Sequence, residues 1–348
     1  MPSVTNRARH AFGVWDSHLP PEFYGRERDE VSLLAIDTKS GAYSSTPFTD
    51  ISRFLRRGDI LVFNNSMLVP SSLPVFDNTT GTSGYLNFGT SRKDGMILVE
   101  PRPKTFNRML DADEGEVTII GPGTGIALKG RHETFQRFVW ANAEFGEHRL
   151  SEILSKYGAP LTYDHIPFKL PLEYYRTAFS SVPGSSEFPS AARPFSRRVM
   201  GMLRSRGVGI AEITLHCNLS PLEPSEFDGA PTLLEEQYAI GEEAAGSINR
   251  TREAGGRVIA VGTSVVRALE SSYNGGVVPR SAGTDLFIRP GHEIRAVDGL
   301  VTGMHDPESS HVEMISSFVD DALLQSAYST ALSLGYQWHE FGDLSLVL

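Results

Sequence analysis

Residues 257–270 read RVIAVGTSVVRALE, and they decide the fold class that we expect for this chain. An apolar run of strand length ends at Val261 and passes through a tight turn directly into a helical pattern. Strand, turn and helix in this order are typical of α/β proteins, in which ligands bind beyond the carboxyl ends of strands. Gly262 allows close approach to the backbone, and Thr263 and Ser264 supply hydroxyl groups. The free N–H groups of such a helix start favour an anion such as a carboxylate, although a hydroxyl residue there is commonly only a helix cap.

Helix and strand patterns continue to alternate upstream of this segment. Residues 242–254 predict a helix that ends at two glycines. Ser196 is expected to cap a helix that runs to about Ser205, and residues 207–216 combine a turn with a strand. This alternation predicts an α/β domain in which at least some of the strands are parallel.

Two more buried strands are predicted nearer the amino terminus. SLLAID at 32–37 and DILVFN at 59–64 are short apolar runs bordered by turn residues. Between them, residues 50–57 place apolar side chains at helical spacing. The three segments therefore predict a strand–helix–strand unit.

Residues 69–149 show a different sequence pattern from the rest of the chain. Short alternating segments separated by turn residues predict a small all-β barrel or sandwich in this window. Helical periodicity returns at Leu150, with Gly158 as the expected end of that helix. We therefore expect a large α/β domain formed by residues 1–68 and 150–348, into which an all-β barrel domain of residues 69–149 is inserted.

The overall charge bears on the choice of partner. The formal net charge is −10, from 42 acidic and 32 basic side chains, so the average field repels a phosphate backbone. Four arginines between Arg197 and Arg206 form either a local basic stripe or an ordinary solvated helix face. Binding to tRNA is therefore doubted but left open.

Cysteine usage and hydropathy suggest a cellular setting. The single cysteine, Cys217, excludes an internal disulfide framework and is most simply a small core residue. The apolar runs in the sequence are shorter than a membrane span, and the first residues lack the apolar region of a secretion signal. We therefore expect a cytoplasmic protein without a membrane partner.

Three polar residues at predicted strand ends are candidates for catalysis. His216 ends the strand TLH at 214–216, and Asp285 begins an apolar run in GTDLFI. His305 precedes DPE at 306–308, which looks like the start of a long helical stretch. The positive end of a helix favours a neutral imidazole, which can accept a proton. Each of these residues can equally be a hydrogen-bonded structural group.

Several familiar site motifs are missing. The sequence lacks the glycine-rich dinucleotide and P-loop patterns, the zincin motif and the nucleophile elbow of α/β-hydrolases. The ten histidines show no paired spacing typical of a metal site. We therefore expect no metal.

Taken in order, several segments of the chain resemble the family of S-adenosylmethionine:tRNA ribosyltransferase-isomerases, enzymes of queuosine biosynthesis. The matching segments are LPPE at 19–22, SLLAID at 32–37, RGDILVFN at 57–64, TLH at 214–216, GGRVIAVGTS at 255–264, VRALE at 266–270, GTDLFI at 283–288 and FGD at 341–343. The resemblance spans nearly the whole chain. It implies a large α/β, barrel-like domain that carries a small inserted β-barrel.

The resemblance also implies a reaction and a set of site residues. Enzymes of this family transfer and isomerise the ribosyl part of S-adenosylmethionine onto a 7-aminomethyl-7-deazaguanine base in tRNA, and they release adenine and methionine. The sulfonium acidifies the ribose C5′ hydrogens, so a positioned base starts the reaction without a metal. The implied catalytic residues are His305, His216 and Asp285. The implied binding residues for S-adenosylmethionine are Gly262, Thr263, Ser264, Arg267, Glu236, Tyr238 and Asp343.

Departures from the family pattern concern the acceptor. The pattern carries arginine where this chain has Met67, Ser72 and Glu308, and histidines where it has 189–195 and 233–238. Each lost arginine removes a bidentate partner for phosphate or carboxylate. Three hypotheses follow, of which the second is slightly favoured: a tRNA ribosyltransferase-isomerase, an enzyme with the same donor chemistry but a small-molecule acceptor or none, and a non-catalytic binding protein of the same fold.

Overall fold

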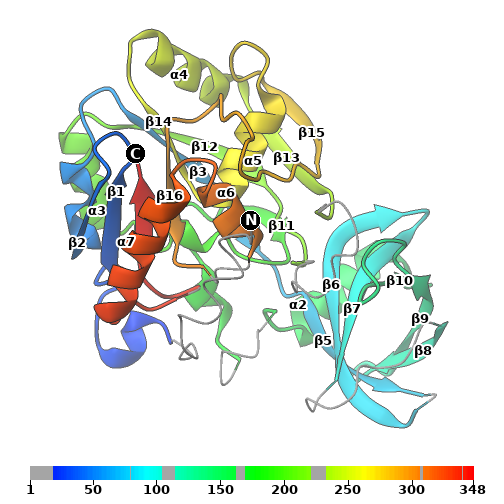
Figure 1. Cartoon of the computed structure of the whole chain (residues 1–348). Coiled ribbons are helices and arrows are strands. Elements are labelled where there is room, and N and C mark those ends of the chain that lie inside the picture. The colour runs from blue at the N-terminus through cyan, green and yellow to red at the C-terminus, as the bar shows by residue number, and fades with distance from the viewer. Residues whose placement is uncertain are drawn as a thin grey trace.

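A computed structural model describes residues 19–78, 80–103, 114–161, 169–220, 233–305, 309–338 and 340–348. Figure 1 shows a large mixed sheet with helices packed around it and, to one side, a closed β-barrel. The predicted fold class, an α/β domain with a small all-β barrel, is confirmed.

The large sheet contains nine strands. They are β1 (Ser32–Asp37), β2 (Ala42–Pro47), β3 (Ile60–Asn64), β12 (Gly209–Leu215), β13 (Glu236–Ile240), β14 (Val258–Val261), β15 (Arg280–Thr284), β16 (Gly299–Gly303) and β17 (Leu344–Val347). Their order is β15-β13-β12-β3-β14-β16-β17-β1-β2. The four neighbours β12, β3, β14 and β16 are parallel. Their carboxyl ends therefore meet at one edge of the sheet, which we call the carboxyl edge.

Both faces of the sheet are covered, which explains why β14 is apolar throughout and β3 is apolar up to Asn64. On one face pack the α-helices α4 (Glu242–Glu253), α5 (Thr263–Ser272), α6 (Ser310–Ile315) and α7 (Asp321–Ser333). On the other pack α3 (Arg197–Ser205) and the 3-10 helices η2 (Phe48–Arg53) and η4 (Ser190–Ala192). In β3, Ile60 and Val62 face the first layer while Leu61 and Phe63 face the second.

Six antiparallel strands form the barrel. They are β5 (Ser72–Asp77), β6 (Thr82–Lys93), β7 (Met96–Pro103), β8 (Glu114–Ile119), β9 (Thr124–Arg131) and β10 (Val139–Asn142), and they close in the order β10-β7-β6-β5-β8-β9. Helix α2 (Gly146–Tyr157) contributes Leu150 and Ile153 to the barrel core. This helix begins four residues before the position where its periodicity becomes visible in the sequence. The division at residues 69 and 149 stays a prediction.

The barrel docks close to the carboxyl edge through β6. The side-chain oxygen of Asn218 accepts a hydrogen bond from the backbone N–H of Thr90 at 2.8 Å, and its amide nitrogen donates to Ser91 Oγ at 2.7 Å. A Cβ on Gly89 would lie 2.6 Å from the Asn218 oxygen. Only glycine permits this close approach of the two units.

The predicted strand–helix–strand unit is wrong in two respects. Residues Phe48–Arg53 form a 3-10 helix rather than an α-helix over 50–57, because Pro47 precedes the segment and too few residues follow before the turn at Gly58. In addition, β1 and β3 are not neighbours, since β14, β16 and β17 lie between them. Strand β1 pairs instead with β2 and β17. Local patterns do not specify which strands pair.

The other predicted elements agree with the structure except near residue 306. Ser196 caps α3 by accepting a hydrogen bond from the Val199 N–H, and α4, β14 and α5 follow as expected. The segment 306–308 lies outside the described residues. The long helical stretch expected after it is divided between α6 and α7. The remaining elements of the described chain are short. They are the 3-10 helices η1 (Pro21–Tyr24) and η3 (Leu172–Tyr175) and a parallel pair of strands, β4 (Ser66–Leu68) and β11 (Val182–Ser185).

Candidate functional site

Asn64, at the end of β3, links the strand ends of the carboxyl edge. Its side-chain nitrogen donates to the carbonyl oxygen of Leu215 at 2.8 Å and to Ser264 Oγ at 3.2 Å. Its side-chain oxygen accepts from the N–H groups of Ser66 and Leu215, each at 3.0 Å. One buried amide thus holds three strand ends in register.

His216 follows β12 and belongs to a hydroxyl chain. Its Nδ1 lies 2.7 Å from Ser66 Oγ, which lies 2.6 Å from Ser185 Oγ. Its ring packs against Gly184, where a Cβ would come within 2.6 Å of the imidazole. Burial lowers the pKa of His216, so the imidazole is neutral at physiological pH. A neutral imidazole can take up a proton, and this agrees with the catalytic role that the resemblance implies.

The turn at Gly262 shapes the start of α5. Gly262 has φ 99° and ψ 148°, a conformation that residues with a side chain rarely adopt. Thr263 Oγ1 lies 3.0 Å from His311 Nδ1, and Ser264 Oγ accepts from Asn64. Both hydroxyl groups therefore point into the carboxyl edge rather than to solvent.

Arg267 and Glu236 form a buried ion pair one turn further along α5. The guanidinium also donates to the carbonyl oxygen of Leu286 at 2.9 Å and to that of Thr284 at 3.2 Å. The other oxygen of Glu236 accepts from the Asn218 N–H at 2.8 Å. Most donors of Arg267 are thus already engaged, which favours a role in positioning over direct contact with a ligand carboxylate.

His305 and His311 stack with ring centroids 4.1 Å apart and planes at 15°. His305 Nε2 lies 2.9 Å from Oγ1 of Thr302, a buried residue near the end of β16. Burial, and then the positive charge of Arg267, lowers the pKa of His311 to about 4. His311 is therefore neutral at physiological pH, and it joins His305 to Thr263.

The remaining predicted residues lie apart from this cluster. Asp285 follows β15 with its side chain exposed to solvent. Tyr238 is 3% exposed and packs in the apolar core beneath β13. The carboxylate of Asp343 accepts from the backbone N–H groups of Ser32 and Gln337, so it fixes the chain ahead of β17. Direct roles for these three residues in the reaction stay predictions.

A cavity of about 90 Å³ opens among the clustered residues. Its lining includes Glu187, Cys217, Asn218, Leu219, Ser220, Leu233, Leu234, Glu236, Thr263, Ser264, Arg267, Phe287, Ile288, Ser310, His311 and Met314. Sites for complete small molecules usually measure several hundred Å³, so this space is large enough for only one end of such a ligand. The segments 221–232 and 306–308, which adjoin the lining in sequence, lie outside the described residues.

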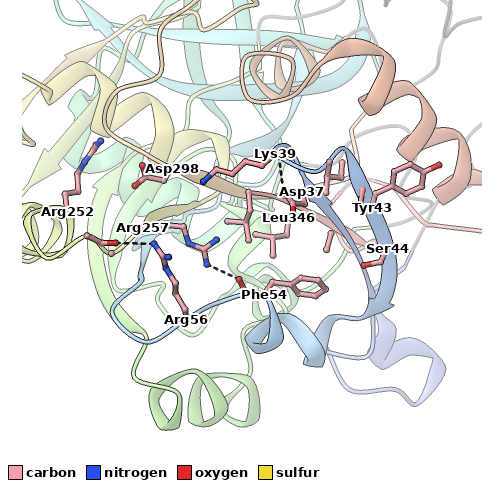
Figure 2. Close-up of a pocket in the computed structure, with 16 residues that line it drawn as sticks. Asp37, Lys39, Tyr43, Ser44, Phe54, Arg56, Arg252, Arg257, Asp298 and Leu346 are labelled. Atoms are coloured by element: carbon pink, nitrogen blue, oxygen red, sulfur yellow. Dashed lines mark hydrogen bonds between the residues drawn. The ribbon is translucent and has the colours of Figure 1, made fainter.

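A larger cavity, of about 740 Å³, lies at the opposite edge of the sheet, where Arg257 precedes β14. Figure 2 shows the guanidinium groups of Arg56 and Arg257 turned to backbone carbonyl oxygens, those of Gly255 and Phe54. Arg257 also binds the buried carboxylate of Asp59 at 2.6 Å. These cations hold loops together, and ligands of parallel α/β sheets bind at the carboxyl edge. The smaller cavity is therefore the better candidate.

Sequence reasoning missed several residues of the candidate site. Asn64 ends a predicted strand and Ser66 follows it, and this position is a signal that could have identified both. Ser185, Glu187 and His311 come from segments without a recognisable motif, and only the fold brings them to the carboxyl edge.

Within the parts of the chain that the structure describes, there is no grouping of three histidine, cysteine, aspartate or glutamate side chains suited to a metal ion. Over the same residues, no helix combines the length and apolarity needed to cross a membrane.

The fold and the site define a class of protein: an α/β protein with a β-barrel docked beside a polar cavity at the carboxyl edge of its sheet. A family model described as "Queuosine biosynthesis protein" matches residues 16–347, and the chain belongs to this family. The predicted family is therefore confirmed.

Curated relatives agree with this assignment. Proteins from Carboxydothermus hydrogenoformans and Thermus thermophilus are each 32% identical to this chain, over 96% of it and over 98% and 99% of their own lengths. A protein from Symbiobacterium thermophilum is 33% identical over 96% of this chain and 98% of its own. All three are named S-adenosylmethionine:tRNA ribosyltransferase-isomerase. The chain is accordingly an enzyme of a transferase and isomerase family.

A solved structure from Thermotoga maritima, described as an S-adenosylmethionine tRNA ribosyltransferase, also matches. It covers 96% of this chain and 99% of that chain, at 25% identity and a TM-score of 0.49.

Proposed function

We propose that this protein is a cytoplasmic enzyme that uses S-adenosylmethionine as a ribosyl donor and releases adenine and methionine. The observation that carries the proposal is the cavity at the carboxyl edge, where hydroxyl groups, the neutral His311 and a helix start converge in a chain of this family. The relatives' names state this donor.

In this proposal the methionine end of the donor occupies the cavity. Its carboxylate meets the first N–H groups of α5 and the hydroxyls of Thr263 and Ser264, because a helix start favours an anion. His216 and His305, both at the same edge, are the candidates for the base that removes a ribose C5′ proton. Arg267 and Glu236 position the start of α5 through their ion pair.

Two acceptors remain, each favoured by an observation. A small-molecule acceptor, or none, is favoured by the net charge of −10 and by the missing arginine at Met67. A tRNA base is favoured by the relatives' names. The missing arginine at Ser72 is weaker evidence against a tRNA acceptor than the sequence suggests. This position is 4% exposed and lies where β5 begins.

The proposal is tested by incubating the purified protein with S-adenosylmethionine and measuring adenine by chromatography. Adenine without any added acceptor favours the non-tRNA enzyme, whereas release only in the presence of precursor tRNA favours the tRNA enzyme. Failure to bind S-adenosylmethionine contradicts the proposed activity, and binding without adenine release in either case excludes both the acceptor-free enzyme and the tRNA enzyme.

The location of the donor is tested separately by Thr263→Val, which removes a hydroxyl but keeps the shape of the side chain. We expect weaker binding of S-adenosylmethionine in calorimetry, by about three- to tenfold for the loss of one hydrogen bond. Thr46→Val makes the same change on β2, an edge strand four places from β14 in the sheet, and serves as control. Equal affinities of the two variants would refute the placement.

A further inference from the structure

His216, at the carboxyl edge, ends a chain of hydroxyl groups. Its Nδ1 lies 2.7 Å from Ser66 Oγ, and Ser66 Oγ lies 2.6 Å from Ser185 Oγ. At the other end of the chain the backbone N–H of Cys217, a donor that cannot reverse, donates to Ser185 Oγ at 2.9 Å. Both serines are 0% exposed, so their hydroxyl protons need acceptors within the protein.

The acceptors within reach of Ser185 fix the direction of this chain. Its hydroxyl proton can go to Ser66 Oγ, at 2.6 Å, or to the sulfur of Cys217. Burial raises the pKa of this thiol, so the sulfur stays protonated and neutral, and a neutral thiol is a weak acceptor. Ser185 therefore donates to Ser66. The oxygen of Ser66 is then an acceptor, and its own proton goes to His216 Nδ1.

The direction of the chain sets the tautomer of His216. Burial lowers the pKa of this histidine, so the ring is neutral and carries a single N–H proton. Because Nδ1 accepts from Ser66, that proton is on Nε2, which makes Nε2 a hydrogen-bond donor. Among the residues that the structure describes, Nε2 has no hydrogen-bond partner. The next residue, Cys217, lines the cavity, so Nε2 is close to the proposed ligand.

We infer that Ser185 and Ser66 are positioning residues that hold His216 in the Nε2–H tautomer, so that His216 serves the ligand of this site as a neutral hydrogen-bond donor. Ribose hydroxyl oxygens and adenine ring nitrogens are acceptors of the required kind. In this tautomer Nε2 has no lone pair for a proton, which leaves His305 of the two candidate bases. The role toward the ligand rests on the proposed donor, whereas the tautomer is a property of the protein alone.

Nitrogen NMR of protein with isotopically labelled histidine tests the tautomer at neutral pH without any ligand. The unprotonated ring nitrogen resonates far downfield of the protonated one, and couplings to the two ring C–H protons distinguish Nδ1 from Nε2. His216→Gln lacks the His216 signals and so identifies them among the ten histidines. We expect an unprotonated Nδ1. A protonated Nδ1 in the unchanged protein would overturn the inference.

The positioning role is tested in the same spectra with Ser185→Ala and Ser66→Ala. Each variant breaks the chain, so one of them in folded form is sufficient. We expect the two His216 nitrogen signals to move toward each other, because both tautomers are then populated and exchange. Ser44→Ala, exposed on β2, should leave the signals unchanged. Signals that also stay unchanged when the chain is broken would show that the hydroxyl groups do not select the tautomer.

The role toward the ligand is tested by adenine release from S-adenosylmethionine. The amide nitrogen of His216→Gln reaches about as far as Nε2 and donates a hydrogen bond, but it cannot act as a base. We expect this variant to stay within about tenfold of the unchanged protein, as for one weakened hydrogen bond, and His216→Leu to lose more. A loss of about 10²–10⁴-fold in His216→Gln, which is typical of a missing base, would overturn the donor role.

Equal rates of His216→Gln and His216→Leu would also overturn the donor role, since only glutamine can donate. If the unchanged protein itself releases no adenine with or without precursor tRNA, the proposed function is wrong, and the NMR spectra still decide the tautomer.

Discussion

The thiol of Cys217 lines the cavity and is unreactive as a nucleophile. Burial is the main cause that raises the pKa of Cys217, and the carboxylates of Glu236 and Glu187 add to it. A thiol that keeps its proton is a poor nucleophile. Its backbone N–H donates to Ser185 Oγ at 2.9 Å, an interaction that does not depend on the side chain.

Cys217→Ser should therefore retain adenine release to within about a factor of two, or ~0.4 kcal/mol in activation free energy. The assay is the same chromatographic measurement, with circular dichroism as the check on folding. A well-folded Cys217→Ser protein without activity would assign the thiol a role in the chemistry.

Glu340 makes the folded protein less stable as the pH rises, whereas a typical carboxylate makes it more stable. Burial, followed by the negative charge of Glu187, raises its pKa to about 8 in the folded protein from about 4.5 in an unfolded chain. Between these values the folded state binds more protons than the unfolded state, so stability falls as the pH rises through this window.

Glu340→Gln removes this dependence. Its free energy of unfolding relative to the unchanged protein should increase from pH 5 to pH 8 and then level off. Denaturant unfolding of both proteins at several pH values measures this difference. The contributions of neighbouring charged groups largely cancel because these residues are the same in both proteins: Glu187, Arg28, Arg193 and Asp343. Parallel curves over the whole range would show that Glu340 is not held in its protonated form.

At the scale of elements, the turn from β14 into α5 places the hydroxyl groups of the site. Gly262 has φ 99° there, and its N–H donates to the Val301 carbonyl oxygen at 2.8 Å. A Cβ would meet Ser264 Oγ only at 3.6 Å, so the obstacle to a side chain is backbone strain rather than lack of space.

Gly262→Ala should lower the free energy of unfolding by about 1–3 kcal/mol, which is the usual cost of such a conformation. Gly201, exposed within α3 and without neighbours within 4 Å of a new Cβ, provides the matched control. Gly201→Ala should stabilise the protein by about 0.4–1 kcal/mol. Equal effects of the two substitutions in urea unfolding would contradict the strain at Gly262.

For the whole molecule, charge and the position of the barrel decide how a large partner could approach. The barrel docks through Asn218, next to the cavity, so a macromolecular acceptor would have to pass beside it. The basic stripe lies on α3, where Arg197 and Arg204 are exposed. Arg198 is engaged by the buried carboxylate of Asp29 at 2.7 Å.

We expect precursor tRNA to bind more weakly than about 1 µM at ~0.15 M salt, because the net charge of −10 opposes it. Titration of labelled tRNA measures this affinity. Tighter binding that Arg197→Glu with Arg204→Glu abolishes, but that Lys129→Glu on the exposed side of the barrel does not, would overturn the prediction. Arg198 is left unchanged because it forms an ion pair with the buried carboxylate of Asp29.

The sequence by itself determined the elements whose signal is local: the strand at β3, the helix at α4, the cap at Ser196 and the turn at Gly262. Periodicity and turn chemistry act within a few residues, so they can be seen in a single chain. Tertiary structure alone decided which strands are neighbours and which side chains meet. The Thr263–His311 contact, the Arg267–Glu236 pair and the Ser66–His216 contact each join segments far apart in sequence. Asp285 is exposed although its local pattern suggested a site. Such contacts arise from the packing of the whole sheet, which no local pattern encodes.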